Sequence, residues 1–251
     1  MSDFDRNLAT ARSGYGADQV AIDAGLRAYM IRVYNYMASG VALTGIVAWL
    51  TFSAAVQNVD GRLALTPFGK AIYGGPAALI LLFGTLGLVF FLSFRISRLQ
   101  PSTALTLFMV YAGLLGLVLS SIFLSYTGAS ITRTFFISAA SFGALSLYGY
   151  STERDLSPIG SFLIMGLFGL ILAMVVNIFL KSTGLEFAIS AIGVLIFAGL
   201  TAWDTQKIKE MYSANDDGTV TSRKAVMGAL ALYLDFINLF LFLLRFLGDR
   251  R

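Results

Sequence analysis

The sequence predicts an all-α membrane protein with several transmembrane helices. Hydrophobic residues make up 57% of the 251-residue chain and charged residues only 13%, and the mean hydropathy is +0.77. A soluble domain is typically about 25% charged. Several apolar stretches exceed the roughly 18 residues that indicate a membrane-spanning helix. We therefore expect a polytopic bundle of helices.

Seven apolar stretches account for most of the chain. Short polar breaks, such as QNVDGR at 57–62 and STERDLSP at 151–158, separate them, and no soluble domain fits within these breaks. The longest connector is 207–224. Seven crossings are therefore the simplest topology. The expected spans are 29–54, 73–94, 103–125, 133–150, 158–180, 186–206 and 225–247.

The first 28 residues are polar and lack the basic start and short apolar core of a cleavable signal peptide. The first apolar segment should therefore remain in the mature chain. We expect two parts, which are a polar cytoplasmic segment over residues 1–28 and a seven-helix transmembrane domain over residues 29–251.

The lysine and arginine residues favour a cytoplasmic N-terminus, because positively charged loops usually remain on that side. With that orientation the cytoplasmic segments carry Arg6, Arg12, Arg27, Arg95, Arg98, Arg154, Lys207, Lys209, Arg223 and Lys224. The outer loops carry only Arg62, Lys70, Arg133 and Lys181. The three arginines of the last seven residues disagree, since they would lie near the outer face. A re-entrant last segment would return them to the cytoplasm.

The chain contains no cysteine and no histidine. This excludes disulfides, haem ligation by His or Cys, typical zinc sites and a Ser–His–Asp protease. The basic residues are scattered rather than clustered, so nucleic acid is not an expected partner. We expect no enzymatic activity and no bound cofactor.

Two aspartates lie where a bilayer disfavours charge. Asp204 ends the apolar run 187–203, and Asp235 lies in the middle of the run 229–248. A carboxylate at the centre of a membrane helix costs ~2.5–3.5 kcal/mol, so such groups normally face a protein interior and carry function. Two alternatives remain open. Asp204 could simply reach headgroup water, and Asp235 could be buried for packing specificity.

The two aspartates are expected at similar depths. If the last helix enters the membrane at Ala225, Asp235 lies ~15 Å deep at 1.5 Å per residue. The sixth span should continue as a helix to Tyr212, which places Asp204 ~12 Å from the same surface. The two carboxyl groups could therefore meet.

Polar neighbours support an inward-facing site. Asp235, Asn238 and Arg245 lie within about 80° of one another on a helix. Thr201 precedes Asp204 by one turn. Taken alone, Arg245 is typical of a cation that extends to the interface from the end of its helix.

An aspartate pair of this kind predicts a pH-sensitive switch. Two carboxylates a few ångströms apart in a poorly hydrated place cannot both ionise easily, so the pair would share one proton. Loss of that proton would create repulsion. The helices would then part, or a nearby arginine or a metal ion would restore the charge balance.

The sequence Gly-x-x-Gly-Leu occurs three times within predicted spans. Small residues one turn apart allow helix backbones to approach closely in membranes. We interpret the three segments as packing contacts rather than as a ligand groove. They are Gly84–Leu88, Gly113–Leu117 and Gly166–Leu170.

Two C-terminal segments resemble a known family. FAGLTAWDTQKIKEMY at 197–212 and ALALYLDFINLFLFLLRFLG at 229–248 closely resemble the signature segments of the Bax inhibitor 1 family, also called the transmembrane Bax inhibitor motif or lifeguard family. The resemblance covers almost the whole chain in length and span count, although the first four spans match only in general character. It implies six helices in a two-layer sandwich around a central C-terminal helix, here 225–247.

The resemblance also implies a function, namely a pH-sensitive calcium leak gated by an aspartate pair that matches Asp204 and Asp235. In bacterial relatives an arginine at the inner end of the second span exchanges with the pair. Arg98 matches it best, and Arg95 is the alternative. Calcium takes six to eight oxygen ligands. Two carboxylates and Asn238 would therefore form only a weak transit site.

Two other functions remain open. The chain could be a regulatory membrane protein that binds a membrane protease or another partner, with the polar N-terminal segment as its contact. It could also export a small solute in exchange for protons through the same aspartates. The compact loops suggest the inner membrane of a bacterium.

Overall fold

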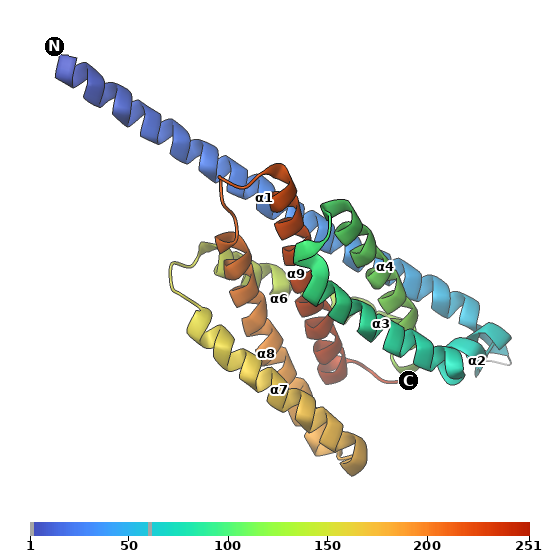
Figure 1. The fold of residues 1–251 in the computed structure, drawn as a ribbon. Coiled ribbons are helices and arrows are strands. Elements are labelled where there is room, and N and C mark those ends of the chain that lie inside the picture. Colours follow the sequence, from blue (N-terminus) through green and yellow to red (C-terminus); the bar gives the residue numbers. More distant parts are fainter. Residues whose placement is uncertain (1–2, 60–61) are drawn as a thin grey trace.

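The structure is a computed structural model that describes the backbone of residues 3–59 and 62–251 and the side chains of residues 22–59 and 62–251 (Figure 1). Its elements are α1 (Asp3–Ala55), β1 (Val56–Val59), β2 (Arg62–Leu65), α2 (Pro67–Gly74), α3 (Pro76–Arg95), the 3₁₀ helix η1 (Ile96–Arg98), α4 (Pro101–Leu119), α5 (Ile122–Ser125), α6 (Gly128–Ser151), α7 (Ser157–Leu180), α8 (Thr183–Glu210) and α9 (Gly218–Leu247). The predicted polar segment 1–28 lies largely outside the residues whose side chains are described, so its separate character stays a prediction.

Six helical segments among the described residues are long and apolar enough to cross a membrane. They are Ile22–Ala55, Pro76–Arg98, Pro101–Ser125, Ser157–Leu180, Thr183–Glu210 and Gly218–Leu247. They coincide with six of the seven expected spans. The remaining expected span, 133–150, coincides with α6, which has the length but not the apolarity.

The composition of α6 explains this difference. One face of α6 carries small hydroxyl side chains that are buried against the rest of the protein, and Ser138 donates a hydrogen bond to the carbonyl of Thr134 at 2.8 Å. A hydroxyl group that bonds to its own helix, as Ser138 does, lowers the apolarity of α6 without leaving its polar atom unpaired. Thr134 differs, because its buried Oγ1 has no hydrogen-bond partner among the described residues.

The connection after α1 departs from the expected all-α chain. β1 and β2 form an antiparallel hairpin in which Val56 pairs with Leu65. The short helix α2 follows, and its first turn is capped by Thr66, whose Oγ1 accepts a hydrogen bond from the backbone N–H of Gly69 at 3.1 Å. The expected second span, 73–94, therefore splits into the end of α2 and the separate helix α3.

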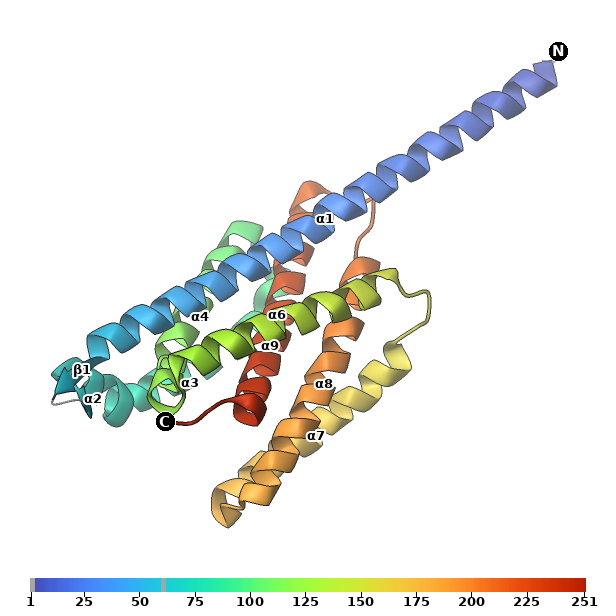
Figure 2. The ribbon, with the colours of Figure 1, turned by 180° about the vertical axis from the view of Figure 1, so that it is seen from behind.

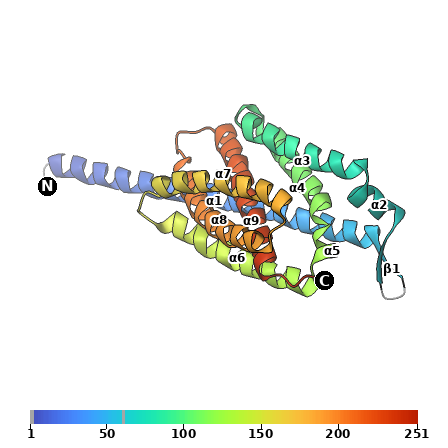
Figure 3. The same cartoon turned by 90° about the horizontal axis from the view of Figure 1, so that it is seen from below.

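The C-terminal helix α9 lies at the centre of the molecule. In its most apolar window 72% of residues are buried, compared with 6% for α7. It contacts α1, α4, α6 and α8. The surrounding helices form two groups, because α4 packs on α1 and α3, whereas α8 packs on α6 and α7. Figures 1 and 3 show one group on each side of α9.

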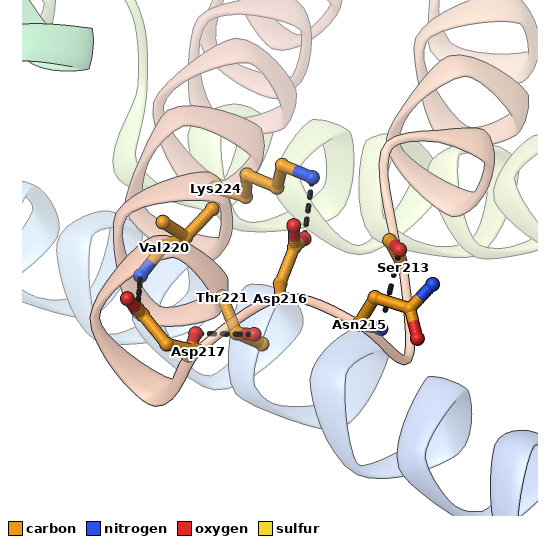
Figure 4. Close-up of polar contacts among 7 residues, drawn as sticks. All are labelled: Ser213, Asn215, Asp216, Asp217, Val220, Thr221 and Lys224. Atoms are coloured by element: carbon orange, nitrogen blue, oxygen red, sulfur yellow. Dashed lines mark hydrogen bonds and ion pairs between the residues drawn. The ribbon is translucent and has the colours of Figure 1, made fainter.

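The connector 211–217 between α8 and α9 is held by polar contacts (Figure 4). Asp217 caps α9, since its Oδ1 accepts a hydrogen bond from the N–H of Val220 at 2.7 Å. Asp216 forms an ion pair with Lys224. The connector is shorter than the expected 207–224, because α8 continues to Glu210 and α9 begins at Gly218.

The C-terminal tail lies at the opposite end of the molecule from this connector. Helix α9 runs unbroken for 30 residues, or ~45 Å. Beyond it, the N–H of Arg251 donates to the carbonyl of Ser125 at 3.0 Å, and Arg250 pairs with Glu186 at the start of α8. The alternative of a re-entrant last segment is therefore wrong.

Most glycines of the three Gly-x-x-Gly-Leu segments do not pack closely against another helix of the same chain. A Cβ on Gly116 would lie 2.8 Å from the carbonyl oxygen of Thr44, as expected for a close approach between helices. By contrast, Gly84, Gly87, Gly113 and Gly169 have open space around them, and Gly166 only a looser contact. The interpretation is correct for one of the three segments.

Candidate functional site

A cavity of about 840 Å³ lies between α3, α7, α8 and α9, and both predicted aspartates line it. Apolar side chains form most of its wall. The polar side chains come from α8 and α9, with one serine from α3. They are Ser93, Asp204, Lys207, Asp235, Asn238 and Arg245.

The two aspartate side chains are neighbours within this cavity. Asp235 is buried by the central position of α9, with 5% of its surface exposed, whereas Asp204 is half-buried. Their carboxyl groups are close enough to interact directly. Oδ2 of Asp235 is fully buried and has no hydrogen-bond partner among the described residues. Because buried polar atoms normally find a partner, a proton shared with Asp204 would explain this arrangement.

Two close contacts between α8 and α9 fix the register that brings the aspartates together. A Cβ on Gly228 would lie 2.9 Å from Ile208, and a Cβ on Gly193 would lie 2.4 Å from Phe242. Along α9 these contacts lie seven residues before and seven residues after Asp235. The small residues allow α8 and α9 to approach closely on both sides of the pair.

Two cations also line the cavity, one on either side of the pair. Lys207 follows Asp204 by one turn, acts on its carboxylate electrostatically, and places its Nζ 4.9 Å from the ring centroid of Trp203. Arg245 lies ten residues beyond Asp235, or ~15 Å along α9, and packs over the ring of Phe242 at 5.8 Å. The cavity thus holds a carboxyl pair between two positive charges.

The two supporting residues predicted from the sequence occupy different places. Asn238 lines the cavity, and its Nδ2 donates to the carbonyl of Leu234 at 2.8 Å. Its amide oxygen is therefore the atom that could bind a cation. Thr201 is fully buried outside the cavity lining, and its hydroxyl donates to the carbonyl of Phe197 at 2.7 Å.

The structure does not bring the predicted arginines to the aspartates. Arg95 and Arg98 are exposed and do not line the cavity. The following residue, Leu99, accepts a hydrogen bond from Nε of Arg223 at 2.9 Å. Arg223 precedes Asp235 by twelve residues, or ~18 Å along α9. An exchange between Arg98 and the pair would therefore require a movement of α3 relative to α9.

The cavity offers few ligands for a metal ion. No group of three or more Asp, Glu, His or Cys side chains capable of holding a metal occurs in the described part of the chain. Asp204, Asp235 and Asn238 supply fewer oxygen atoms than the six to eight that calcium takes, and Lys207 adds a positive charge beside them. A cation could pass through this cavity, but it would depend on water for its remaining ligands.

Sequence reasoning missed Lys207 as part of the site, because it was assigned only to the positive cytoplasmic loops. Its spacing from Asp204 could have identified it as a site residue. Residues three apart share a helix face, so a lysine at this distance lies beside the aspartate. Nothing in the sequence identified Ser93 as a site residue, because its position in the cavity depends on how α3 packs against the other helices.

Comparisons with known proteins cover nearly the whole chain. The family described as "Inhibitor of apoptosis-promoting Bax1" matches residues 26–251. A protein of Rickettsia prowazekii is 49% identical over 251 residues, which is 100% of both chains. Inner membrane protein YbhL of Escherichia coli is 47% identical over 232 residues, covering 91% of this chain and 94% of that protein. A membrane protein of Streptococcus pyogenes is 38% identical over 226 residues, covering 90% and 94%.

Proposed function

This chain belongs to the Bax inhibitor family of membrane proteins, and on that premise we propose that it acts as a pH-sensitive calcium leak in a bacterial inner membrane. The family predicted from the two C-terminal segments is confirmed. The inner-membrane location is supported by the relative from Escherichia coli, which is named inner membrane protein YbhL. The observation that carries the proposal is the contact between Asp204 and Asp235 inside a cavity of a membrane-spanning bundle.

Gating in this proposal depends on one shared proton. At low pH the proton holds the two carboxyl groups together, so α8 stays against α9 and the path is closed. At higher pH the proton is lost, and two anions in a poorly hydrated cavity repel one another. The helices part and calcium passes the two carboxylates and Asn238 in a partly hydrated state.

Cations stabilise the open state in this proposal. Lys207 already lies beside Asp204 and is the first partner available to the freed carboxylate. Arg98 becomes a partner only after the inner end of α3 moves toward the cavity. The exchange of the aspartate pair with Arg98, which the family resemblance implies, is therefore a second step of this proposal.

We further propose seven crossings with a cytoplasmic N-terminus, in which α6 is the seventh transmembrane helix. One end of the bundle gathers the middle of α1 around Arg32, the α3–α4 turn, the α6–α7 loop and the α8–α9 connector. Contacts that support this grouping are the bond of Arg32 to Ser222, of Arg223 to the Leu99 carbonyl and of Gln206 to the Arg154 carbonyl. This end carries most of the lysine and arginine residues, as expected for the cytoplasmic side.

The test is calcium flux into proteoliposomes of the purified protein between about pH 6 and pH 8. We expect flux that rises with pH in the wild type and loses this dependence in the Asp235→Asn and Asp204→Asn variants. Asp216→Asn is the matched control, because Asp216 lies in the connector outside the cavity. Absence of flux above empty liposomes at every pH would contradict the leak and favour a partner-binding role.

A further inference from the structure

A second large cavity lies on the other face of α9, between α1 and α6. It has a volume of about 840 Å³ and an almost entirely apolar lining. It shares Val41, Phe135 and Phe236 with a smaller cavity of about 340 Å³, so the two form one continuous groove. We call this the α1–α6 groove.

The floor of the α1–α6 groove is built from aromatic side chains. Phe236 of α9 meets Phe135 and Phe142 of α6 edge to face, with ring centroids 5.6 and 5.5 Å apart. Figure 2 shows α1 and α6 on the same face of the molecule with α9 behind them. Each of these two helices packs against α9. The groove therefore lies over the core of the protein, and the exposed side chains of Ile31 and Leu147 leave it open at its edges.

The groove is as long as a bilayer core is thick. Its lining runs along α1 from Arg27 to Ala48, which is ~32 Å at 1.5 Å per residue. The hydrocarbon core of a bilayer measures about 30 Å. An apolar ligand that reaches this groove would enter sideways from the membrane, and the acyl chain of a lipid has the matching shape and polarity.

One end of the groove is positively charged. Arg27, Tyr34 and Tyr150 line it there. Lys209 approaches from α8, where its Nζ donates to the carbonyl of Tyr150 at 2.9 Å. Neither aspartate nor glutamate lines the groove, and Arg27 forms no ion pair with the described residues. This mouth lies at the end of the bundle that carries the basic loops, where anionic lipid headgroups bind arginine and lysine.

We propose that the α1–α6 groove binds one anionic phospholipid, with an acyl chain over Phe236 and the phosphate at Arg27 beside the tyrosine hydroxyls. The charge at the mouth selects a phospholipid rather than an uncharged apolar molecule. The aromatic floor supplies contact area, and entry from the bilayer requires no change in the protein. The site lies on the opposite face of α9 from the aspartate pair and does not depend on calcium transport.

The test is native mass spectrometry of the delipidated protein in detergent, titrated separately with phosphatidylglycerol and phosphatidylcholine. The groove can be filled by Gly143→Leu, since Gly143 lines it and a Cβ there meets open space. Gly169→Leu is the matched control, because Gly169 on α7 is equally open but lies outside the groove. Arg27→Gln removes the charge, and Arg32→Gln is its control on the same helix.

We expect the wild type to bind phosphatidylglycerol about tenfold more tightly than phosphatidylcholine, in keeping with one charge-assisted contact. Gly143→Leu should lose this binding, and Arg27→Gln should lose the preference for phosphatidylglycerol. Both controls should match the wild type. Equal binding by Gly143→Leu and Gly169→Leu would overturn the proposal. Equal affinity of the wild type for the two lipids would overturn the assignment of the phosphate to Arg27.

Discussion

The two large cavities of this protein lie on opposite faces of the same helix, and their linings differ in charge. The cavity between α3 and α7 contains two carboxyl groups, an amide and two cations, whereas the α1–α6 groove is apolar except at its mouth. On α9, Asp235 and Asn238 point to one side, and Phe236 and Phe240 lie on the opposite side at 100° per residue. A central helix can thus support an ion site and a lipid site that are separated by its own width.

The two faces of α9 differ in whether a buried charge would find a partner. On the acidic face, the carboxyl groups have charged or proton-sharing neighbours, since Asp204 lies between Lys207 and Asp235. On the aromatic face, Phe236 belongs to the apolar core and packs against the rings of Phe135 and Phe142. A charge should therefore be tolerated on one face and not on the other.

The largest expected effect comes from placing a carboxylate on the aromatic face. Phe236→Asp should lower the free energy of unfolding by about 3–5 kcal/mol, because it buries an unpaired charge and removes an aromatic side chain. Asn238→Asp places a carboxyl group on the acidic face, where it lines a cavity with Lys207 and Arg245 and can take up a proton beside the existing pair, and it should cost less than half as much. Thermal unfolding of both variants in detergent measures the difference, and equal losses would mean that the two faces are not distinct.

The next effect concerns the pH dependence of stability. In the proposed mechanism the folded pair keeps a proton that the separated carboxyl groups of the unfolded chain have already released, so stability should fall as pH rises through the range in which the folded pair loses that proton. The slope can reach about 1.4 kcal/mol per pH unit for one proton. Asp235→Asn should remove this slope, whereas Asp216→Asn should keep it. Parallel slopes for the wild type and Asp235→Asn would show that no proton is shared.

A smaller effect should follow from removing the cation beside the pair. Lys207→Gln withdraws a positive charge from Asp204, so loss of the shared proton becomes harder and the midpoint of calcium flux moves to higher pH. The expected shift is below about one pH unit, since Lys207 is exposed and screened by solvent. Lys209→Gln is the control, because Lys209 contacts Tyr150 instead. A midpoint that shifts equally in both variants would remove Lys207 from the site.

The smallest expected effect tests whether the two cavities act independently. Gly143→Leu fills the α1–α6 groove and should leave both the calcium flux and its midpoint unchanged, because distant sites without shared partners are usually additive. The flux assay that is applied to the aspartate variants provides the measurement. A changed midpoint would show that the groove and the aspartate pair are coupled through α9.

The sequence predicted the parts of the fold that depend on position along one helix. Counting residues from the inner surface placed Asp204 and Asp235 at similar depth, and the structure brings them together. The 3.6-residue period placed Asp235, Asn238 and Arg245 on one face, and all three line the cavity. The continuation of α8 beyond its apolar run is confirmed as far as Glu210, two residues short of the predicted end at Tyr212.

Features that depend on packing between helices could not be predicted in this way. The place of Arg98 is set by how α3 sits against α9, which no single helix reveals. The same holds for glycines, because Gly116 and Gly87 are each the second glycine of a Gly-x-x-Gly-Leu segment but only Gly116 faces another backbone. The burial of the hydroxyl face of α6 is a further example, since it depends on the packing of α6 against α8 and α9.

The most direct test of the account measures the distance across the mouth of the acidic cavity. Because the chain has no cysteine, spin labels on Ser93→Cys of α3 and Ile164→Cys of α7 report on two rim residues without background. In proteoliposomes we expect this distance to change between pH 6 and pH 8 in the otherwise wild-type chain, because α3 and the packed pair α7 and α8 both move relative to α9, and to lose this pH dependence when Asp235→Asn is added. A distance that does not change with pH, or that changes equally without Asp235, would contradict gating by the aspartate pair.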